Sequence, residues 1–172
     1  MGYLRRILVG AIGAVSLIGA SAVGVSAHDG GQLIQFDSMT PVSGTSVGTV
    51  NDRGIKGGGL PWVITSGHGH VDRDGRLSVT VKGLIIVVPP VNGKNPIANF
   101  SATVSCVTPS GTVNVTTGLF PASGSGDSKI KAKVALPSRC HDPEVFVGTT
   151  NAATGAFAWF AMSNGEGDEA DD

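Results

Sequence analysis

The chain has 172 residues, and its 12 lysines and arginines nearly balance its 13 aspartates and glutamates. This length accommodates one domain. The sequence has no basic stripe with interleaved aromatic residues, which argues against nucleic acid as the partner.

The N-terminal segment has the layout of a secretory signal peptide. Arg5 and Arg6 precede an almost uncharged run that ends in the small residues Val25-Ser26-Ala27. We therefore predict a signal peptide at 1–27, cleavage before His28, and an exported mature protein without a membrane span. The alternative is an uncleaved anchor, but the run is rich in Gly, Ala and Ser and short beside the roughly 20 strongly apolar residues of a spanning helix.

The mature chain consists of apolar runs separated by turns. Glycine is abundant, and no stretch of a dozen residues repeats apolar side chains at helical spacing. Turn sequences such as Asp74-Gly75 and Asn92-Gly93 separate the runs. The predicted strands are 33–39, 61–66, 77–88, 100–108, 112–117, 129–136, 144–149 and 156–162.

About eight short strands predict an all-β fold, and we expect an antiparallel β-sandwich of immunoglobulin-like or related topology over residues 28–163. A small barrel is the alternative. Lysines alternate with apolar residues over 129–134, which gives that strand one face in water. Residues 100–106 alternate in the same way, with Cys106 in the apolar row that faces the core.

Cys106 and Cys140 are the two cysteines of the chain, and an even count suits an oxidising compartment. They are too few and too far apart for a metal cluster. We predict a disulfide between them, which closes a loop of about 35 residues and is worth roughly 3 to 4 kcal/mol on the chain-entropy model.

Residues 164–172 form an acidic C-terminal segment, with five carboxylates in the last seven positions. We predict a disordered, solvated tail. Removal of the leader leaves the mature protein with a net charge of about −3. A tail that collects calcium or docks a partner is the alternative.

The segment from Ser66 to Gly75 contains the best candidates for a site. On an extended strand, His68, His70, Asp72 and Asp74 project from one face. Two such imidazoles could hold zinc or copper, and the carboxylates could complete the ligand set. A hairpin with a polar, solvated face is the plainer interpretation, and it is the one we favour.

Two enzymatic alternatives have weaker support. After cleavage, His28 would offer copper its amine and its ring, as in the oxidative copper enzymes that cut polysaccharides, with His68, His70 or His141 as the second imidazole. Residues 44–48 match the G-x-S-x-G nucleophile pattern around Ser46, but the preceding strand and following helix that this motif requires are missing from the sequence pattern.

Three glycines precede Trp62, and they allow the backbone to approach another element closely. A buried indole is favoured over a carbohydrate-stacking platform, a role for which Trp159 and Phe160 are the other candidates. Apolar residues on both faces around Trp159 indicate a central buried strand.

The chain resembles a group of small exported actinobacterial-type proteins of unknown function. The resemblance rests on the ordered motifs GGGLPWVI (57–64), DGRLSVTVKGLII (74–86), ATVSC (102–106), LPSRC (136–140), VFVG (145–148) and AWFAMS (158–163). It covers most of the mature chain, but the group carries no assigned reaction, so the resemblance implies a fold and no catalytic residues. The His68 and His70 pair does not belong to the shared pattern.

The expected function is that of a secreted, non-enzymatic module, extracellular or associated with the cell envelope, that binds a partner or has a structural role. No cofactor is predicted, and the partner is not identified by the sequence. The alternative is a zinc or copper protein that uses His28 or the pair of His68 and His70.

Overall fold

The computed structural model describes residues 31–165, and within this range every regular element except one short 3-10 turn is a β-strand. The predicted all-β class is confirmed. The predicted leader, His28 and residues 166–172 of the predicted tail lie outside the described residues. No helix within 31–165 has the length and hydropathy needed to cross a bilayer.

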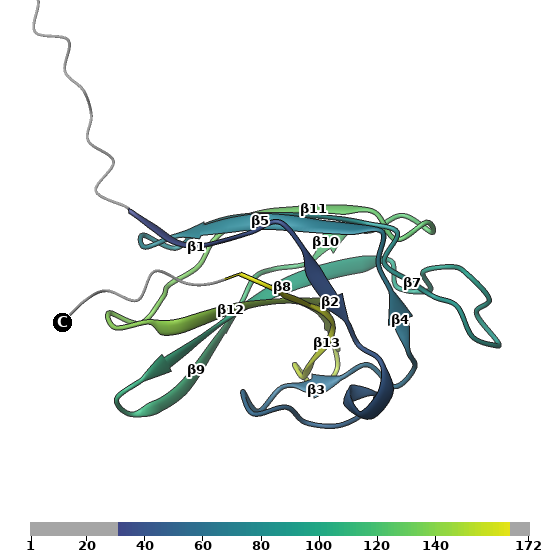
Figure 1. Ribbon diagram of the computed structural model, residues 1–172, viewed down its shortest axis with the longest axis horizontal. Coiled ribbons are helices and arrows are strands. Elements are labelled where there is room, and N and C mark those ends of the chain that lie inside the picture. The colour runs from purple at the N-terminus through teal and green to yellow at the C-terminus, as the bar shows by residue number, and fades with distance from the viewer. Residues whose placement is uncertain (1–30, 166–172) are drawn as a thin grey trace, which may run out of the picture.

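The strands form two facing sheets, and the smaller one is the upper layer in Figure 1. Within this smaller sheet, all neighbouring strands pair antiparallel. In spatial order its strands are β1 (Gln32–Phe36), β5 (Ser66–Asp72), β6 (Arg76–Lys82) and β11 (Ser128–Lys133).

The larger, seven-stranded sheet forms the lower layer. Its main path is β10 (Phe120–Pro121), β8 (Asn99–Thr108), β12 (His141–Thr150), β13 (Phe157–Ser163) and β2 (Met39–Pro41). Beside this path, β9 (Gly111–Thr116) pairs with β8, and β3 (Lys56–Gly57) pairs in parallel with β13. The remaining elements are the 3-10 turn η1 (Gly44–Ser46) and the two-stranded pair β4 (Trp62–Val63) and β7 (Ile85–Ile86).

The core lies between the sheets, where strands such as β6 and β8 contribute alternate side chains, and it continues on the covered side of the larger sheet with Phe146 and Trp159. Its aromatic centre is formed by Trp62, Phe100 and Phe160. Trp62 stacks on Phe160 with ring centroids 4.1 Å apart, and Phe100 meets both rings edge-on. The predicted antiparallel sandwich is therefore confirmed, with Trp62 inside it.

Two glycines leave room for the core on the inner side of β5. A Cβ on Gly67 would lie 2.6 Å from the Met39 side chain, and one on Gly69 would lie 2.9 Å from the Phe36 ring. Larger residues would displace these core side chains. His68 and His70, which alternate with these glycines along β5, therefore point outward, and both are exposed.

The longest predicted strand, 77–88, is wrong as a single element. β6 ends at Lys82, because Gly83 adopts a φ of +63°, which residues with a Cβ rarely adopt. The Gly83 N–H donates to Asp127 Oδ1 at 2.9 Å instead of continuing a ladder. Residues 31–165 contain thirteen strands rather than about eight, since breaks of this kind and very short pairings are weakly marked in sequence.

The side of the seven-stranded sheet that faces away from the four-stranded sheet is covered, whereas alternation over 100–106 predicts a face in water. The apolar row of β8 faces the core as predicted, but the opposite row of Ser101, Thr103 and Ser105 is also buried. The segment between β2 and β3 lies over this side. The Arg53 carbonyl of that segment accepts a hydrogen bond from Asn114 on β9, and Gly57 of β3, where the segment ends, pairs with Trp159.

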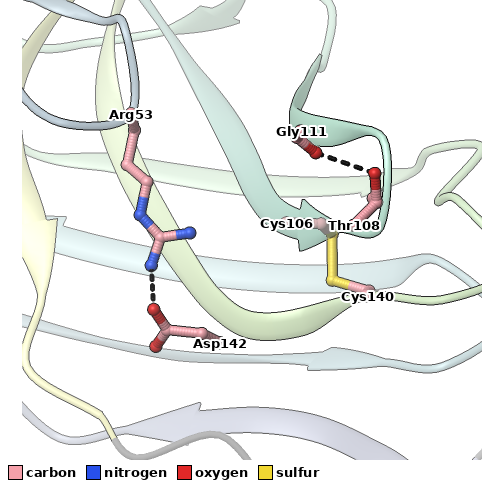
Figure 2. The surroundings of a disulfide bond; sticks show 6 residues. All are labelled: Arg53, Cys106, Thr108, Gly111, Cys140 and Asp142. Atoms are coloured by element: carbon pink, nitrogen blue, oxygen red, sulfur yellow. Dashed lines mark hydrogen bonds and ion pairs between the residues drawn. A yellow bond between two sulfur atoms is a disulfide. The ribbon is translucent and has the colours of Figure 1, made fainter.

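The disulfide links Cys106, near the end of β8, to Cys140, which immediately precedes β12 (Figure 2). The Cα atoms are 4.7 Å apart, and the two residues are separated by 34 positions in sequence. The predicted pairing is confirmed. The bridge joins two neighbouring strands of the larger sheet where β12 begins.

Because this bridge closes a long loop in the unfolded chain, we expect its loss to lower the free energy of unfolding by about 3 to 4 kcal/mol. The double substitution Cys106→Ala, Cys140→Ala, followed by urea denaturation, measures the effect. Wild-type protein in reductant should unfold at nearly the same urea concentration as the variant. An unchanged midpoint in both would contradict the assigned stabilisation.

Candidate functional site

The side of the four-stranded sheet that faces away from the core is polar and accessible. We call it the outer face and define it by ten outward side chains on β5, β6 and β11. All are exposed or half-exposed, and none is Phe, Tyr or Trp. They are His68, His70, Asp72, Arg76, Ser78, Thr80, Lys82, Lys129, Lys131 and Lys133.

The strand register sets these side chains in rows across the sheet. His68 lies opposite Thr80, which in turn lies opposite Lys129. The next row is His70, Ser78 and Lys131. Directly opposed residues have Cβ atoms about 4.5–5.5 Å apart, so each row presents an imidazole, a hydroxyl and an ammonium group side by side.

The end of the outer face near the β5–β6 turn is neutralised by ion pairs. Arg76 Nη2 lies 3.0 Å from Asp74 Oδ2, and Arg76 Nε lies 3.7 Å from Asp72 Oδ2. Lys133 Nζ is 3.6 Å from the same Asp74 oxygen. The backbone N–H of Arg76, followed by the charges of Arg76 and Lys133, holds the pKa of Asp74 below its ordinary value.

The other end of the outer face keeps a positive excess. Within residues 31–165, none of Lys82, Lys129 and Lys131 lies within 4.0 Å of a carboxylate oxygen. Because exposed lysines are strongly hydrated, each contributes little alone. Together they give this half of the face a positive potential that can attract anions.

An open hollow of about 270 Å³ lies at this positive end. Its polar lining includes Thr80, Lys82, Lys129 and Asp127. Asp127 accepts hydrogen bonds from the Gly83 N–H and the Ser125 hydroxyl, both at 2.9 Å, which hold the pKa of its carboxyl below the ordinary value. The hollow therefore offers two ammonium groups, a hydroxyl and one carboxylate that already accepts one hydrogen bond on each oxygen.

The structure brings together three of the four side chains that were considered as metal ligands. His68, His70 and Asp72 share the outward side of β5, whereas Asp74 lies in the turn and pairs with basic residues. No group of three or more His, Cys, Asp or Glu side chains in the described part of the chain is arranged to hold a metal ion. The involvement of His28 lies outside the described residues.

The residues of the nucleophile pattern do not form a catalytic arrangement. Ser46 ends the turn η1, where its hydroxyl donates to the Ser43 carbonyl at 2.7 Å. The chain continues from η1 into extended backbone at Val47 instead of a helix. His141, the other candidate for the catalytic pair, begins β12 and is exposed.

The tryptophans are not available as a carbohydrate platform. Trp62 and Trp159 are each 3% exposed, and Phe160 is 4% exposed. Trp159 packs edge-on against Phe146 with ring centroids 5.7 Å apart, on the covered side of the seven-stranded sheet. The interpretation of these residues as core is therefore the one that the structure supports.

A second charged group, which sequence analysis missed, lies beneath the segment between β2 and β3. This Arg53 cluster consists of Arg53, Asp142 and Glu144. The Arg53 side chain is 4% exposed, hydrogen-bonds to Asp142 (Figure 2), and places Nε 3.3 Å from Glu144 Oε2. The sequence Asn51-Asp52-Arg53-Gly54 is typical of an exposed turn, so no local signal marks the buried arginine.

The Arg53 cluster is constrained by burial. Partial burial raises the pKa of Glu144, Arg53 opposes that shift, and the charges of Asp52 and Asp142 add to it. Arg53 Nη1 and Ser105 Oγ are buried without a hydrogen-bond partner among the described residues. These contacts attach the overlying segment to β12, which is a structural role.

Comparison of the chain with models of protein families, with curated proteins and with solved structures gave no match. The fold and the surfaces described above are therefore the basis for any functional assignment.

The raised pKa of Glu144 predicts a pH-dependent contribution to stability. Between the ordinary value of 4.5 and the raised pKa, the folded protein keeps a proton that the unfolded chain has lost. The contribution is therefore full below pH 4.5 and is lost as the pH rises through the folded pKa. We expect Glu144→Gln to gain stability relative to wild type between pH 4 and pH 7 in urea denaturation.

Asp37→Asn, which changes an exposed carboxylate in the turn after β1, is the control and should follow the wild-type profile. A Glu144→Gln variant whose stability runs parallel to wild type over this range would contradict the assigned pKa shift.

Proposed function

We propose that the protein is a secreted, non-enzymatic binding module that holds an anionic polymer against the outer face. The leader predicted from the sequence and the disulfide support an extracellular setting. The observation that carries the proposal is the positive half of the outer face, where Lys82, Lys129 and Lys131 form no ion pair within 4.0 Å in residues 31–165 and outnumber the nearby carboxylate of Asp127.

The spacing of these groups suits an extended, repeating ligand. Lys129 and Lys131 are two residues apart on β11, so their Cα atoms are about 7 Å apart. Ser78 and Thr80 place hydroxyls beside them on β6. A flat row of ammonium and hydroxyl groups can bind sulfate, phosphate or carboxylate groups on a polymer, and several weak contacts add through multivalency.

A binding role is favoured over an enzymatic one by the dispersal of the candidate catalytic residues. Ser46, His68 and His141 belong to η1, β5 and β12, and no hydrogen bond joins any two of them. A catalytic nucleophile and its base need to lie within hydrogen-bond reach.

The zinc or copper alternative rests on the shared outward side of His68 and His70. Two imidazoles leave a zinc ion short of the three protein ligands usual even in catalytic sites. If untagged protein bound stoichiometric zinc that was lost in the variant His68→Ala, His70→Ala, the metal function would replace the present proposal.

The proposal predicts binding of dextran sulfate and much weaker binding of uncharged dextran, measured by isothermal titration calorimetry in about 50 mM salt. Binding should weaken as salt is added, because exposed charges are screened. We expect Lys129→Gln, Lys131→Gln to weaken the affinity about tenfold, since two of the three ammonium groups at the positive end of the outer face are removed.

The matched control is Lys56→Gln, Lys94→Gln, which removes the same charge from exposed positions outside the outer face. Its affinity should remain within about twofold of wild type. Equal weakening in both double variants would assign the binding to net charge and would overturn the proposed face.

A further inference from the structure

Strand β9 forms an open edge of the seven-stranded sheet. It pairs with β8 from Thr103↔Thr116 to Thr108↔Gly111, and no strand of the described residues pairs with its other side. In Figure 1 the β8–β9 hairpin extends away from the rest of the sheet. Five of its six residues are exposed.

Other edge strands carry features that discourage pairing between molecules. Lysines occupy alternate positions of β11, and the short strands β2 and β10 contain Pro41 and Pro121. On β1, Gly165 lies directly against the Gln35 carbonyl. β9 has neither proline nor charge, and residues 107–126 contain no charged side chain.

The sequence of β9 is also symmetrical. Residues 112–116 read Thr-Val-Asn-Val-Thr, which is the same in both directions about Asn114. In a two-fold dimer every contact occurs twice: where residue i of one copy meets residue j of the other, residue j of the first copy also meets residue i of the second. We propose that two copies of the chain associate by antiparallel pairing of their β9 edges, centred on Asn114.

The backbone of β9 has the required hydrogen-bonding groups on its free side. The Thr117 N–H donates to the Ala102 carbonyl at 2.9 Å, which fixes the alternation along the β8–β9 ladder. Thr112, Asn114 and Thr116 therefore direct their N–H and C=O groups away from β8. In the dimer Asn114 pairs with its own copy, and Thr112 pairs with Thr116 of the second copy.

The side chains complement each other in the same register. Val113, which is 36% exposed, and the half-buried Val115 extend the inward row of β8 to this edge. Each Val113 lies beside Val115 of the second copy, in the closer type of antiparallel pair. The absence of charge near the two-fold axis removes electrostatic repulsion between the copies.

The size of the interface sets the expected strength. Pairing of five residues a side buries less than the roughly 1,200 Å² of stable interfaces. We therefore expect a weak, transient association, with dimers at high protein concentration and monomers at low concentration.

Register-specific crosslinking tests the pairing. In the proposed dimer the two Asn114 Cα atoms are about 5.5 Å apart, within disulfide range, whereas the two Thr112 Cα atoms are about 14 Å apart. Under mild oxidation Asn114→Cys should give a crosslinked dimer on a non-reducing gel, and Thr112→Cys should give little. Equal crosslinking of both variants, or none in either, would overturn the register.

Sedimentation equilibrium up to about 1 mM tests the association without an added cysteine. Val113→Lys should weaken dimerisation at least tenfold, because it places two ammonium groups at the two-fold interface. Val107→Lys is the matched control, since Val107 is 37% exposed on the same hairpin but belongs to β8. Wild-type protein that stays monomeric throughout, or equal effects of the two substitutions, would refute the dimer.

Discussion

Each side chain of a strand faces one of two sides of its sheet, and this constraint organises the whole molecule. The two sheets share one core, and strands such as β5, β6 and β8 direct alternate residues into the space between them. In β5 these residues include Gly67 and Gly69, which make room for Met39 and Phe36. His68 and His70 are outward for that reason, and their exposure follows from packing on the other side of the strand.

The two sheets differ in what covers the side that faces away from their shared core. On the four-stranded sheet, charged and hydroxyl side chains face water, and the surface stays open for a ligand. On the seven-stranded sheet, the segment between β2 and β3 covers the outward row and brings Arg53 into the interior. A buried guanidinium is costly unless it is paired, and Asp142 and Glu144 pair with two of its three nitrogens, Nη2 and Nε. The first surface is therefore suited to binding, and the second to holding the fold together.

Sequence patterns predicted those features that depend on local alternation. The lysines of 129–134 indicated the wet face of β11, and the apolar row of β8 placed Cys106 inward. The rows across the outer face could not be predicted, because they depend on which strands become neighbours and in what register. The burial of Arg53 was missed for a related reason, since it depends on the sheet beneath a turn that looks exposed in sequence.

The binding account is tested most directly by a titration of labelled protein with dextran sulfate, followed residue by residue in two-dimensional NMR spectra. The account predicts that the amide shifts concentrate on β5, β6 and β11, with the largest changes beside Lys129 and Lys131. Shifts confined to the β8–β9 hairpin or to the segment around Arg53 would contradict it.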